Sequence, residues 1–536
     1  MSTVFDEFKR THQRAAERPF LHIPAIASKA YSDHGIDLSY GEAYLLVLSC
    51  RGKYAAQGLH YGQRVALLLE NRAEFFIHWL ALNSLGCSVV PINGEMPAEE
   101  ICYFIEHSES VAVVSIAERI KLLEQAVESI NEPPPIVAHD AIERLRVFAD
   151  TPDRCEPNAS SECALLYTSG STGKPKACIL TNEYFTAFGC WYRNLDGLGQ
   201  IEWGKERLLT PLPLGHMNAM AVSSTAMIMN AGCIVQLDRF HPGSWWQTVR
   251  ESKATIVHYL GVLPAILLQL PENELDDFSN QIKFGFGAGV NPKHHAPFEQ
   301  RFGFPLIESW AMTECGSGGC ITANIEPRHV GTSCFGKPDD SVEYQLIDEK
   351  GQEVSPGKQG ELRVRAAGPD PRRAFFSGYF KNSEATEEIW QDGWLNTGDV
   401  ARQSEDGSLH FVDRRKNVIR RSGENISALE VEAALSLNPA IVEALVSAVP
   451  DEMRGDEVAA CVIAAAGQKA GEALAHAIVH DCLGRLAYFK APGYVLFVAE
   501  LPKTASNKPK RADVKKLARE GVAAGNAIDT RTLKKR

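Results

Sequence analysis

Leu166-Tyr167-Thr168-Ser169-Gly170-Ser171-Thr172-Gly173-Lys174-Pro175-Lys176 is the stretch that decides how this chain is interpreted. The apolar residues 163–166 lead into it as a strand would, and two lysines close it. Its small hydroxyl and glycine residues leave backbone N–H groups accessible and adaptable enough to surround an anion. The pattern favours a polyphosphate-binding loop at the end of a strand. A surface turn rich in serine and glycine is the alternative.

This loop differs from a P-loop. A P-loop has the pattern G-x-x-x-x-G-K-[ST] and leads into a helix whose N-terminus faces the phosphates. Here Gly170 and Gly173 are three residues apart, and Lys174 precedes Pro175, which has no N–H to donate. We therefore expect a phosphate loop of another kind.

Composition narrows the class of protein. A chain of 536 residues is too long for one core, so at least two domains are expected. The formal net charge of −12 argues against a nucleic-acid binder, which would carry a basic face. Thirteen cysteines without C-x-x-C pairs fit reduced thiols, and residues 1–7 do not resemble a secretory signal, so we expect a cytoplasmic protein. Residues 217–237 are uncharged but too polar for a membrane span, so no integral membrane segment is expected.

Alternating strand and helix patterns predict an α/β fold. Apolar strand-like runs at 64–69, 87–92 and 111–115 are separated by helical patterns, and the alternation recurs through residues 234, 256 and 284. Such alternation indicates a parallel sheet with right-handed crossovers. Between residues 342 and 364 short strands with polar turns predict an antiparallel subdomain.

The pattern changes again near residue 415, where we place a domain boundary. Residues 413–421 form a basic run with little apolar content, and Ser427-Ala-Leu-Glu430 is a capping box that predicts the start of a helix. We predict a large N-terminal domain of βα-wound sheets with the antiparallel subdomain (residues 1–415) and a small α+β C-terminal domain (residues 416–536). Residues 523–536 are expected to be a frayed basic tail.

Four further segments carry chemistry, each with a structural alternative. Thr313-Glu314 places a hydroxyl beside a carboxylate, which suits a phosphate and Mg²⁺, or simply the start of a helix. Asp399 follows a glycine turn, where it can accept both ribose hydroxyls or form an Asx turn. The small residues 287–289 let a planar ring approach the backbone, or form an ordinary loop. Lys508 lies in a basic loop that is catalytic or merely solvated.

In this order the segments resemble the adenylate-forming superfamily of acyl-CoA synthetases, nonribosomal adenylation domains and firefly luciferase, over about residues 40–517. The family loop Tyr-Thr-Ser-Gly-[ST]-Thr-Gly-x-Pro-Lys-Gly matches residues 167–176, with Ala177 in place of the last glycine. Its Tyr-Gly-Met-Thr-Glu segment matches at residues 312–314. The segments Thr-Gly-Asp at 397–399, Asp-Arg at 413–414 and Gly-Glu-Asn at 423–425 also match. Among subfamilies, the chain is most similar to crotonobetaine/carnitine–CoA ligase-type enzymes and to medium-chain or aryl acyl-CoA synthetases.

The resemblance implies an ATP-dependent carboxylic acid–CoA ligase. Such an enzyme adenylates a small or medium acid, releases pyrophosphate, and then passes the acyl group to the thiol of coenzyme A with release of AMP. ATP, Mg²⁺, coenzyme A and the acid are the implied ligands, and a homodimer is compatible with the family. A stand-alone enzyme that loads a carrier protein and a non-catalytic AMP-binding relative are the alternatives.

The resemblance also assigns residues to roles. The implied catalytic residues are Lys508, Thr313, Glu314 and His216, and Glu314 is also the implied metal ligand. The implied nucleotide-binding residues are Thr168, Ser169, Gly170, Ser171, Thr172, Gly173, Lys174, Lys176, Gly287, Ala288, Gly289, Trp310, Ala311, Met312, Asp399 and Arg414. The implied hinge of a mobile C-terminal domain is Lys416, and the implied coenzyme A tunnel contains Ser422, Gly423, Glu424 and Asn425. The implied acyl pocket contains Asn218, Met220, Tyr259, Gly261 and Gly318. His216, considered alone, is more often a structural histidine.

Overall fold

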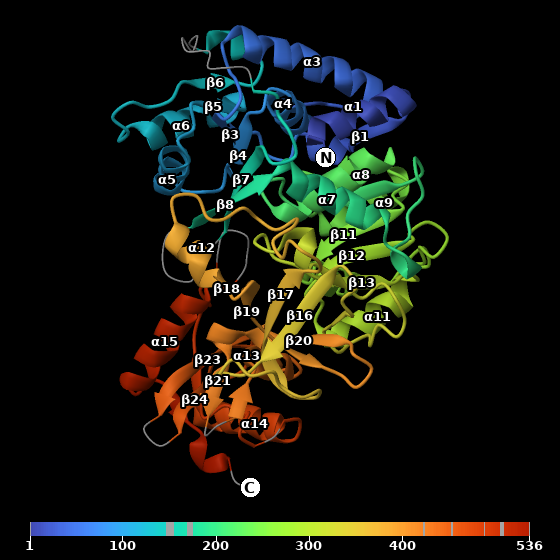
Figure 1. The fold of residues 1–536 in the computed structure, drawn as a ribbon. Helices are drawn as coiled ribbons and strands as arrows, with labels where there is room; N and C mark the ends of the chain where they lie inside the picture. The colour runs from blue at the N-terminus through green and yellow to red at the C-terminus, as the bar shows by residue number, and fades with distance from the viewer. Residues whose placement is uncertain are drawn as a thin grey trace. The chain divides into compact units, whose positions relative to one another are not determined.

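A computed structural model describes residues 2–145, 155–168, 175–421, 424–451, 454–486, 488–503 and 509–534. The chain divides into two compact units, and Figure 1 labels helices and strands of both. The first comprises Met1–Tyr344 and Arg363–Asn396, and the second comprises Gln345–Leu362 and Thr397–Arg536. The predicted domain boundary near residue 415 stays a prediction.

The first sheet of the first unit is parallel except at one edge. In order across the sheet its strands are β6 (Ile136–Ala138), β5 (Ala112–Ser115), β3 (Arg64–Leu68), β4 (Ser88–Pro91), β7 (Glu162–Thr168) and β8 (Lys176–Thr181). Only β8 runs antiparallel to its neighbour. The helices between these strands are α4 (Ala73–Asn83), α5 (Ala98–Ser108) and α6 (Ile120–Val127), and α3 (Tyr40–Ala56) precedes β3. The predicted alternation of strands and helices is confirmed here.

The second sheet of this unit brings the predicted site segments to one edge. Its order is β14 (Ile321–Thr322), β13 (Leu306–Trp310), β12 (Phe284–Ala288), β11 (Ile256–Leu260), β9 (Arg207–Thr210), β10 (Cys233–Gln236), β1 (Pro19–Ile23) and β2 (Ile36–Ser39). Strands β11, β12 and β13 are mutually parallel, so their carboxyl ends meet. In such sheets ligands bind outside the carboxyl ends of the strands.

Further helices lie between the strands of this second sheet along the chain. They are α2 (Ala25–Ser28), α7 (Asn182–Arg193), α8 (Ser224–Asn230), α9 (Trp245–Glu251), α10 (Val262–Leu268) and α11 (Pro292–Phe302). The uncharged stretch 217–237 forms a π-helical turn Asn218–Ser223, then α8 and β10, as a buried helix followed by a strand. Within the described residues, no helix combines the length and the apolar content needed to cross a membrane.

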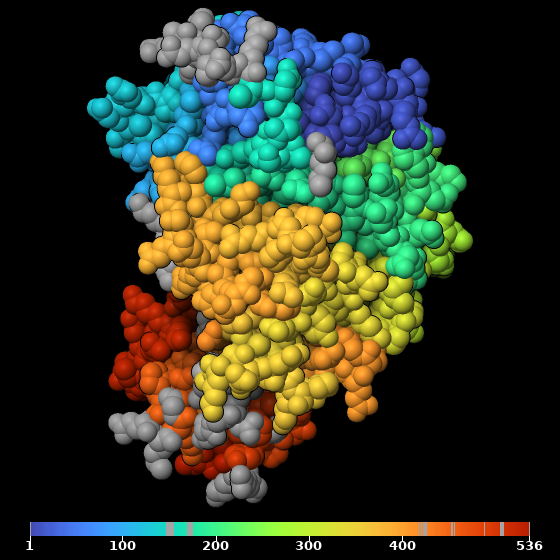
Figure 2. Space-filling view, in the orientation of Figure 1, coloured from blue at the N-terminus to red at the C-terminus, as the bar shows by residue number. Residues whose placement is uncertain are grey.

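The N-terminal helix α1 (Val4–Ala15) ties the elements of the first unit together. The side chain of Thr3 caps the helix, and Thr11 Oγ1 donates to the Ile228 carbonyl of α8 at 2.7 Å. The Val4 N–H donates to Asn182 Oδ1 at 3.0 Å, at the start of α7. In the space-filling view α1, in dark blue, lies against the green surface that includes α8 (Figure 2).

Short strands follow the second sheet, as predicted for residues 342–364. They are β15 (Cys334–Gly336), β16 (Val342–Ile347), β17 (Gln359–Ala366), β18 (Trp390–Gln391), β19 (Trp394–Gln403) and β20 (Leu409–Arg414), with α12 (Ser383–Ile389) preceding β18. Strands β19 and β20 pair antiparallel, with Asp399 opposite Arg414. Strands β16, β17 and β19 each continue from one unit into the other.

The second unit contains a sheet covered by helices on both faces. Its elements are β21 (Ile419–Arg421), β22 (Glu424–Ile426), α13 (Ala428–Leu435), β23 (Ile441–Asp451), β24 (Gly455–Ala464), α14 (Glu472–Leu483), β25 (Tyr494–Phe497), α15 (Arg511–Ala523) and β26 (Ile528–Asp529). Val431 of α13 and Ile478 of α14 belong to one core cluster. Val514 of α15 belongs to another, with Leu445 and Cys461. The predicted small α+β domain is confirmed as a fold.

The expectation of a frayed tail was wrong for residues 523–534, and residues 535–536 lie outside the described part of the chain. Strand β26 pairs with β25, the fully buried Thr530 donates to the Pro492 carbonyl at 2.8 Å, and the buried Lys534 binds Glu457 at 2.6 Å. Arg421 of the basic run is also buried and binds the same carboxylate at 2.9 Å. A buried carboxylate needs cations and donors from whatever part of the chain supplies them, and here they come from both ends of the unit.

The predicted capping box at the start of α13 is half correct. Ser427 Oγ accepts from the Glu430 N–H at 3.2 Å and therefore caps the helix. The Glu430 carboxylate binds Lys490 at 2.6 Å. The capping box predicted that this carboxylate would accept from the N–H of Ser427, but Lys490, which is distant in sequence, binds it instead.

We predict that Glu299 makes stability depend on acid pH. Burial acts to raise its pKa, but hydrogen bonds from Arg328, His295 and the Leu306 N–H outweigh it and lower the pKa to about 2. Because the folded state binds this proton less tightly, the stabilisation is present above pH 4.5 and is lost as pH falls towards 2. Glu299→Gln should lower the free energy of unfolding at pH 7 by about 2 kcal/mol, allowing for partial exposure.

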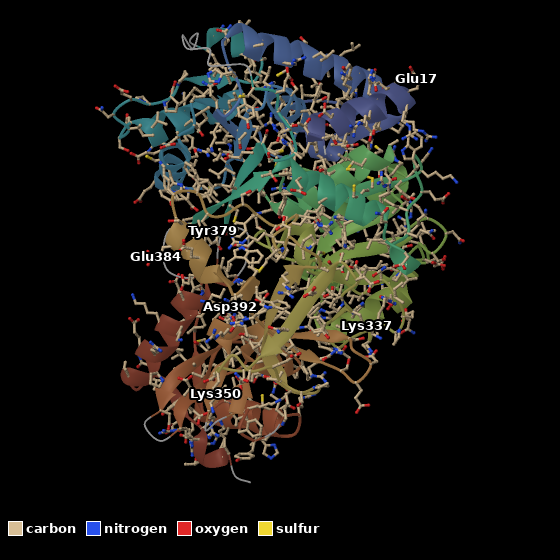
Figure 3. All side chains as sticks on the ribbon, viewed as in Figure 1. Glu17, Lys337, Lys350, Tyr379, Glu384 and Asp392 are labelled. Atoms are coloured by element: carbon tan, nitrogen blue, oxygen red, sulfur yellow. The ribbon has the colours of Figure 1, made fainter. Side chains whose placement is uncertain are left out.

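Urea denaturation between pH 7 and pH 3 measures this effect. The Glu299→Gln protein should lose less stability on acidification than the wild type. Glu17, which is exposed and labelled in Figure 3, provides the control variant Glu17→Gln. Parallel pH curves for Glu299→Gln and the wild type would contradict the assignment.

Candidate functional site

The Ser/Gly/Lys loop joins two neighbouring antiparallel strands. Thr168 at the end of β7 lies opposite Lys176 at the start of β8. Residues 169–174, which include the predicted ligands Ser169, Gly170, Ser171, Thr172, Gly173 and Lys174, lie outside the described part of the chain. Because the chain continues as strand β8 and not as a helix, the loop is not a P-loop, as expected.

A buried carboxylate lies beside the end of this loop. Glu314, which follows β13, is 6% exposed. Its Oε1 accepts a hydrogen bond from Thr168 Oγ1 at 3.2 Å and another from the Tyr379 hydroxyl at 2.9 Å. The structure thus brings together Thr168 and Glu314, which the sequence analysis had placed in one site. The neighbouring Thr313 is held by its carbonyl, which accepts from the Tyr184 hydroxyl at 3.0 Å.

Tyr379 was missed by the sequence analysis. It lies just before α12 (Figure 3) and forms a bridge with Cys178 of β8, which places it next to the loop. Burial and the charge of Glu314 raise the pKa of Tyr379, so its hydroxyl remains a donor at neutral pH. Lys176 Nζ lies 5.0 Å from the centre of its ring. Neither spacing nor charge marks this residue, because its partners are remote in sequence.

The Glu314 carboxylate suits a magnesium ion that is bound together with substrate phosphates. Among the described residues there is no cluster of three or more His, Cys, Asp or Glu side chains that could enclose a metal. Mg²⁺ is commonly held by one or two carboxylates, with substrate phosphates and water completing its octahedron. A single oriented carboxylate, Glu314, beside a predicted phosphate loop has this character.

A second buried carboxylate, also missed from the sequence, fixes the predicted adenine loop. Glu308 of β13 accepts from the Gly289 N–H at 2.9 Å and from the Tyr259 hydroxyl at 2.8 Å. Burial raises the pKa of Glu308 despite these bonds. A Cβ on Gly261 would lie 1.7 Å from the Gly289 carbonyl oxygen, so the two loops pack backbone to backbone.

The loop at 287–289 leaves its backbone accessible. Ala288 and Gly289 are exposed, whereas Gly287 is buried. Trp310, at the end of the adjacent β13, is buried and packs against Phe335 with ring centres 6.1 Å apart. A planar ligand can therefore approach the backbone of residues 288–289. Ala311 and Met312, which follow Trp310, are half-buried.

The residues predicted for the acyl pocket differ in exposure. His216 is exposed and Asn218 is half-buried at the start of the π-helical turn. Met220, Tyr259 and Gly318 are buried, and a Cβ on Gly318 would lie 2.3 Å from the Arg373 carbonyl oxygen. His216 and Asn218 are thus the members whose side chains a ligand can reach directly. The pocket assignments stay predictions.

The second unit places the predicted ribose ligand next to an arginine. Asp399 is 4% exposed, and its Oδ1 lies 3.0 Å from Arg414 Nε. Its N–H donates to Thr397 Oγ1 at 3.0 Å, and Gly398 between them has a φ of +68°, which favours glycine. The Thr-Gly-Asp sequence therefore lies within strand β19, where Gly398 has a positive φ, and not in the glycine turn expected from the sequence.

Several predicted residues cannot be placed. Lys508, Ser422 and Gly423 lie outside the described residues, as do the side chains of Lys416, Glu424 and Asn425. Their catalytic, hinge and tunnel roles stay predictions that depend on the resemblance.

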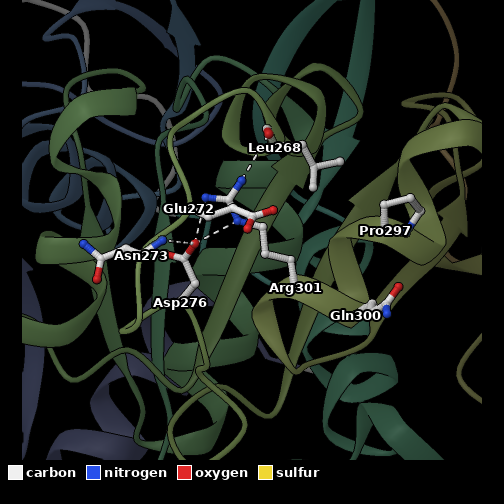
Figure 4. Close-up of a pocket in the computed structure, with 7 residues that line it drawn as sticks. All are labelled: Leu268, Glu272, Asn273, Asp276, Pro297, Gln300 and Arg301. Carbon is white, nitrogen blue, oxygen red and sulfur yellow. Dashed lines mark hydrogen bonds and ion pairs between the residues drawn. The ribbon is translucent and has the colours of Figure 1, made fainter.

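A cavity of about 500 Å³ lies elsewhere in the first unit, between the end of α10 and α11 (Figure 4). Arg301 crosses it and binds Asp276 at 2.7 Å and the Leu268 and Leu270 carbonyls at 3.1 and 2.9 Å. Because its guanidinium is bound to these groups of the cavity wall, we assign Arg301 a structural role. The cavity is lined by Leu268, Glu272, Asn273, Asp276, Pro297, Gln300 and Arg301, none of them a predicted site residue.

We predict that removing the Tyr379 hydroxyl costs more stability than removing a comparable neutral hydrogen bond. Hydrogen bonds to charged groups contribute about 1.5–3 kcal/mol and neutral ones about 1 kcal/mol. Thermal unfolding of Tyr379→Phe and of the matched variant Tyr184→Phe compares a bond to the Glu314 carboxylate with a bond to the Thr313 carbonyl. An equal or smaller loss for Tyr379→Phe would show that its hydroxyl does not support the carboxylate.

Comparison with known proteins places this chain in a family. The family model described as AMP-binding enzyme matches residues 8–380, more than half of the chain. The model described as AMP-binding enzyme C-terminal domain matches residues 430–508.

Full-length relatives agree with these models. The chain is 28% identical over 504 residues to a sulfoacetate–CoA ligase of Cupriavidus necator, covering 92% of this chain and 94% of the relative. It is 26% identical over 481 residues to a crotonobetaine/carnitine–CoA ligase of Escherichia coli, covering 85% and 89%. Its fold is similar to that of o-succinylbenzoate CoA synthetase of Bacillus subtilis, solved with its acyl-adenylate intermediate, at a TM-score of 0.78 and 24% identity over 96% of this chain and 98% of the other. The chain therefore belongs to the AMP-binding enzyme family, the adenylate-forming superfamily that includes the acyl-CoA synthetases.

Proposed function

We propose that the protein is an ATP-dependent carboxylic acid–CoA ligase. It adenylates a small or medium carboxylic acid with release of pyrophosphate, and then transfers the acyl group to the thiol of coenzyme A with release of AMP. The observation that carries the proposal is the hydrogen-bonded cluster of Thr168, Glu314 and Tyr379 beside the Ser/Gly/Lys loop. The names of the two relatives, both CoA ligases, support the choice of acceptor.

The first half-reaction needs electrostatic stabilisation more than proton transfer. A carboxylate is a poor acyl donor until AMP replaces its oxide leaving group. As the acid attacks the α-phosphate, negative charge increases on the departing pyrophosphate. Preorganised donors and cations in a site that excludes water stabilise such charge without reorganising.

Each part of the site has an assigned task in this scheme. The loop at 169–176 binds the pyrophosphate portion, and Thr313 contacts the α-phosphate. Glu314, oriented by two hydroxyl donors, would hold Mg²⁺, and the ion would supply positive charge beside the phosphate oxygens. Lys508 stabilises the in-line transition state, and His216, which is exposed, contributes to the acid site.

The nucleoside and thiol portions complete the assignment. The accessible backbone of residues 288–289 receives adenine, and Asp399, held by Arg414, receives the ribose hydroxyls. Rotation about Lys416 brings residues 422–425 to the thiol for the second half-reaction. We place the reaction in the cytoplasm, which agrees with thirteen cysteines that are all free thiols.

Carboxylate-dependent exchange of labelled pyrophosphate into ATP tests the proposal. At least one small or medium acid in a broad panel should support exchange and then form a thioester with coenzyme A. Thioester formation on carrier proteins alone would favour the carrier-loading alternative. AMP binding without exchange for any acid would leave a non-catalytic nucleotide-binding protein.

Lys508→Ala separates the two half-reactions. Adenylation should fall by about 10² to 10³-fold, because a positioned charge in the transition state is lost. Thioester formation from a supplied acyl-adenylate should be largely retained. Lys510, exposed two residues away, provides the control variant Lys510→Ala. Equal loss of both steps in Lys508→Ala would refute the assigned role.

A further inference from the structure

A buried histidine that the proposed mechanism does not use lies behind the predicted acyl pocket. His258 of β11 is fully buried, and its ring packs against Phe286 of β12 with centres 5.1 Å apart. Its Nε2 lies 3.0 Å from the Tyr192 hydroxyl, and its Nδ1 lies 2.8 Å from Ser223 Oγ and 2.9 Å from Asn218 Oδ1. The ring therefore connects the helix α7 to both ends of the π-helical turn Asn218–Ser223.

The protons in this network have one arrangement that pairs every group. Burial lowers the pKa of His258 to about 3, so the ring is neutral and carries a single N–H. Ser223 Oγ donates to the Asn218 carbonyl at 3.0 Å, so this hydroxyl accepts from the ring. The N–H is then on Nδ1, which donates to Ser223 Oγ and Asn218 Oδ1, while Nε2 accepts from Tyr192. Buried polar groups are paired in this way almost without exception.

This arrangement gives the Asn218 amide a fixed polarity. Its oxygen is turned inward to His258, so its NH₂ group is the part left for other partners. Asn218 is half-buried, and among the described residues no hydrogen bond engages its Nδ2. A π-helical turn at this point is itself a common feature of functional sites. The NH₂ group is thus a pair of donors held in one orientation by a buried ring.

We propose that His258 is a positioning residue that orients the Asn218 amide so that its NH₂ group binds a second oxygen acceptor on the acid substrate, one apart from the reacting carboxylate. This inference rests on the proposed function and names its substrate class. Acids that carry a hydroxyl, carbonyl, sulfonate or second carboxylate oxygen are preferred over hydrocarbon acids of the same shape. A hydrocarbon acid would cover the amide donors without pairing them, and such unpaired donors are what polar sites use to reject analogues.

Isosteric acid pairs test this preference directly. Sulfoacetate is compared with 3,3-dimethylbutanoate, and 3-hydroxybutanoate with 3-methylbutanoate, by pyrophosphate exchange. The wild type should favour the oxygen-bearing member of at least one pair by about 10-fold or more in kcat/KM. A preference for the hydrocarbon member in both pairs would overturn the inference.

His258→Phe tests the positioning role. The preference should fall towards unity through a higher KM for the oxygen-bearing acid, with the KM for ATP changed less than about two-fold. His258→Gln, which keeps a donor and an acceptor, should restore most of it. His78→Phe is the matched control, because His78 is another buried histidine bound to a tyrosine hydroxyl (Tyr54, 2.6 Å) with a pKa lowered to about 3 by burial, but on α4. An equal effect of both Phe variants would indicate a purely structural role.

Asn218→Asp keeps the inference falsifiable if His258→Phe does not fold. This substitution replaces the NH₂ donors with an acceptor of nearly the same shape. It should abolish the preference for an anionic or carbonyl oxygen, because kcat/KM for the oxygen-bearing acid should fall more than kcat/KM for its hydrocarbon counterpart. An unchanged preference would overturn the inference. Absence of exchange with every acid in the wild type would instead overturn the proposed function, so the two failures are distinguishable.

Discussion

The hydrogen bonds to the Glu314 carboxylate are the constraint on which the rest of the site depends. A carboxylate removed from water is costly unless donors replace its hydration. Glu314 obtains two of them, from Thr168 at the end of β7 and from Tyr379 before α12. These contacts align the end of the phosphate loop with the chain that follows β13. The predicted phosphate loop therefore begins beside a carboxylate that is already oriented.

A second buried carboxylate applies the same principle to the neighbouring loops. Glu308 of β13 accepts hydrogen bonds from the Gly289 N–H, which follows β12, and from the hydroxyl of Tyr259, which lies in β11. One carboxylate can reach both groups because β11, β12 and β13 are parallel and their carboxyl ends meet at one edge of the sheet. The predicted nucleotide loop and acyl pocket therefore share one structural support. His258, the neighbour of Tyr259 in β11, binds Asn218, another residue of the predicted acyl pocket.

Local patterns predicted the elements well and their distant partners poorly. The strands at 64–69, 87–92 and 111–115 were readable because apolar runs and helical periodicity are local signals. The ordered structure of residues 528–534 could not be predicted from local patterns, because it depends on Glu457, some seventy residues earlier. Similarly, Ser427 was correctly identified as a cap, while the partner of Glu430 proved to be Lys490.

The sequence by itself determined the family, since the ordered motifs from Thr168 to Lys508 match those of the family. Only the tertiary structure decided which groups touch. Tyr379, Glu308 and His258 have no distinguishing sequence pattern, yet each contacts a predicted site residue. The physical reason is that a buried polar group is paired by whichever strand or helix lies next to it. Strand order sets that neighbour, and motif spacing along the chain does not encode it.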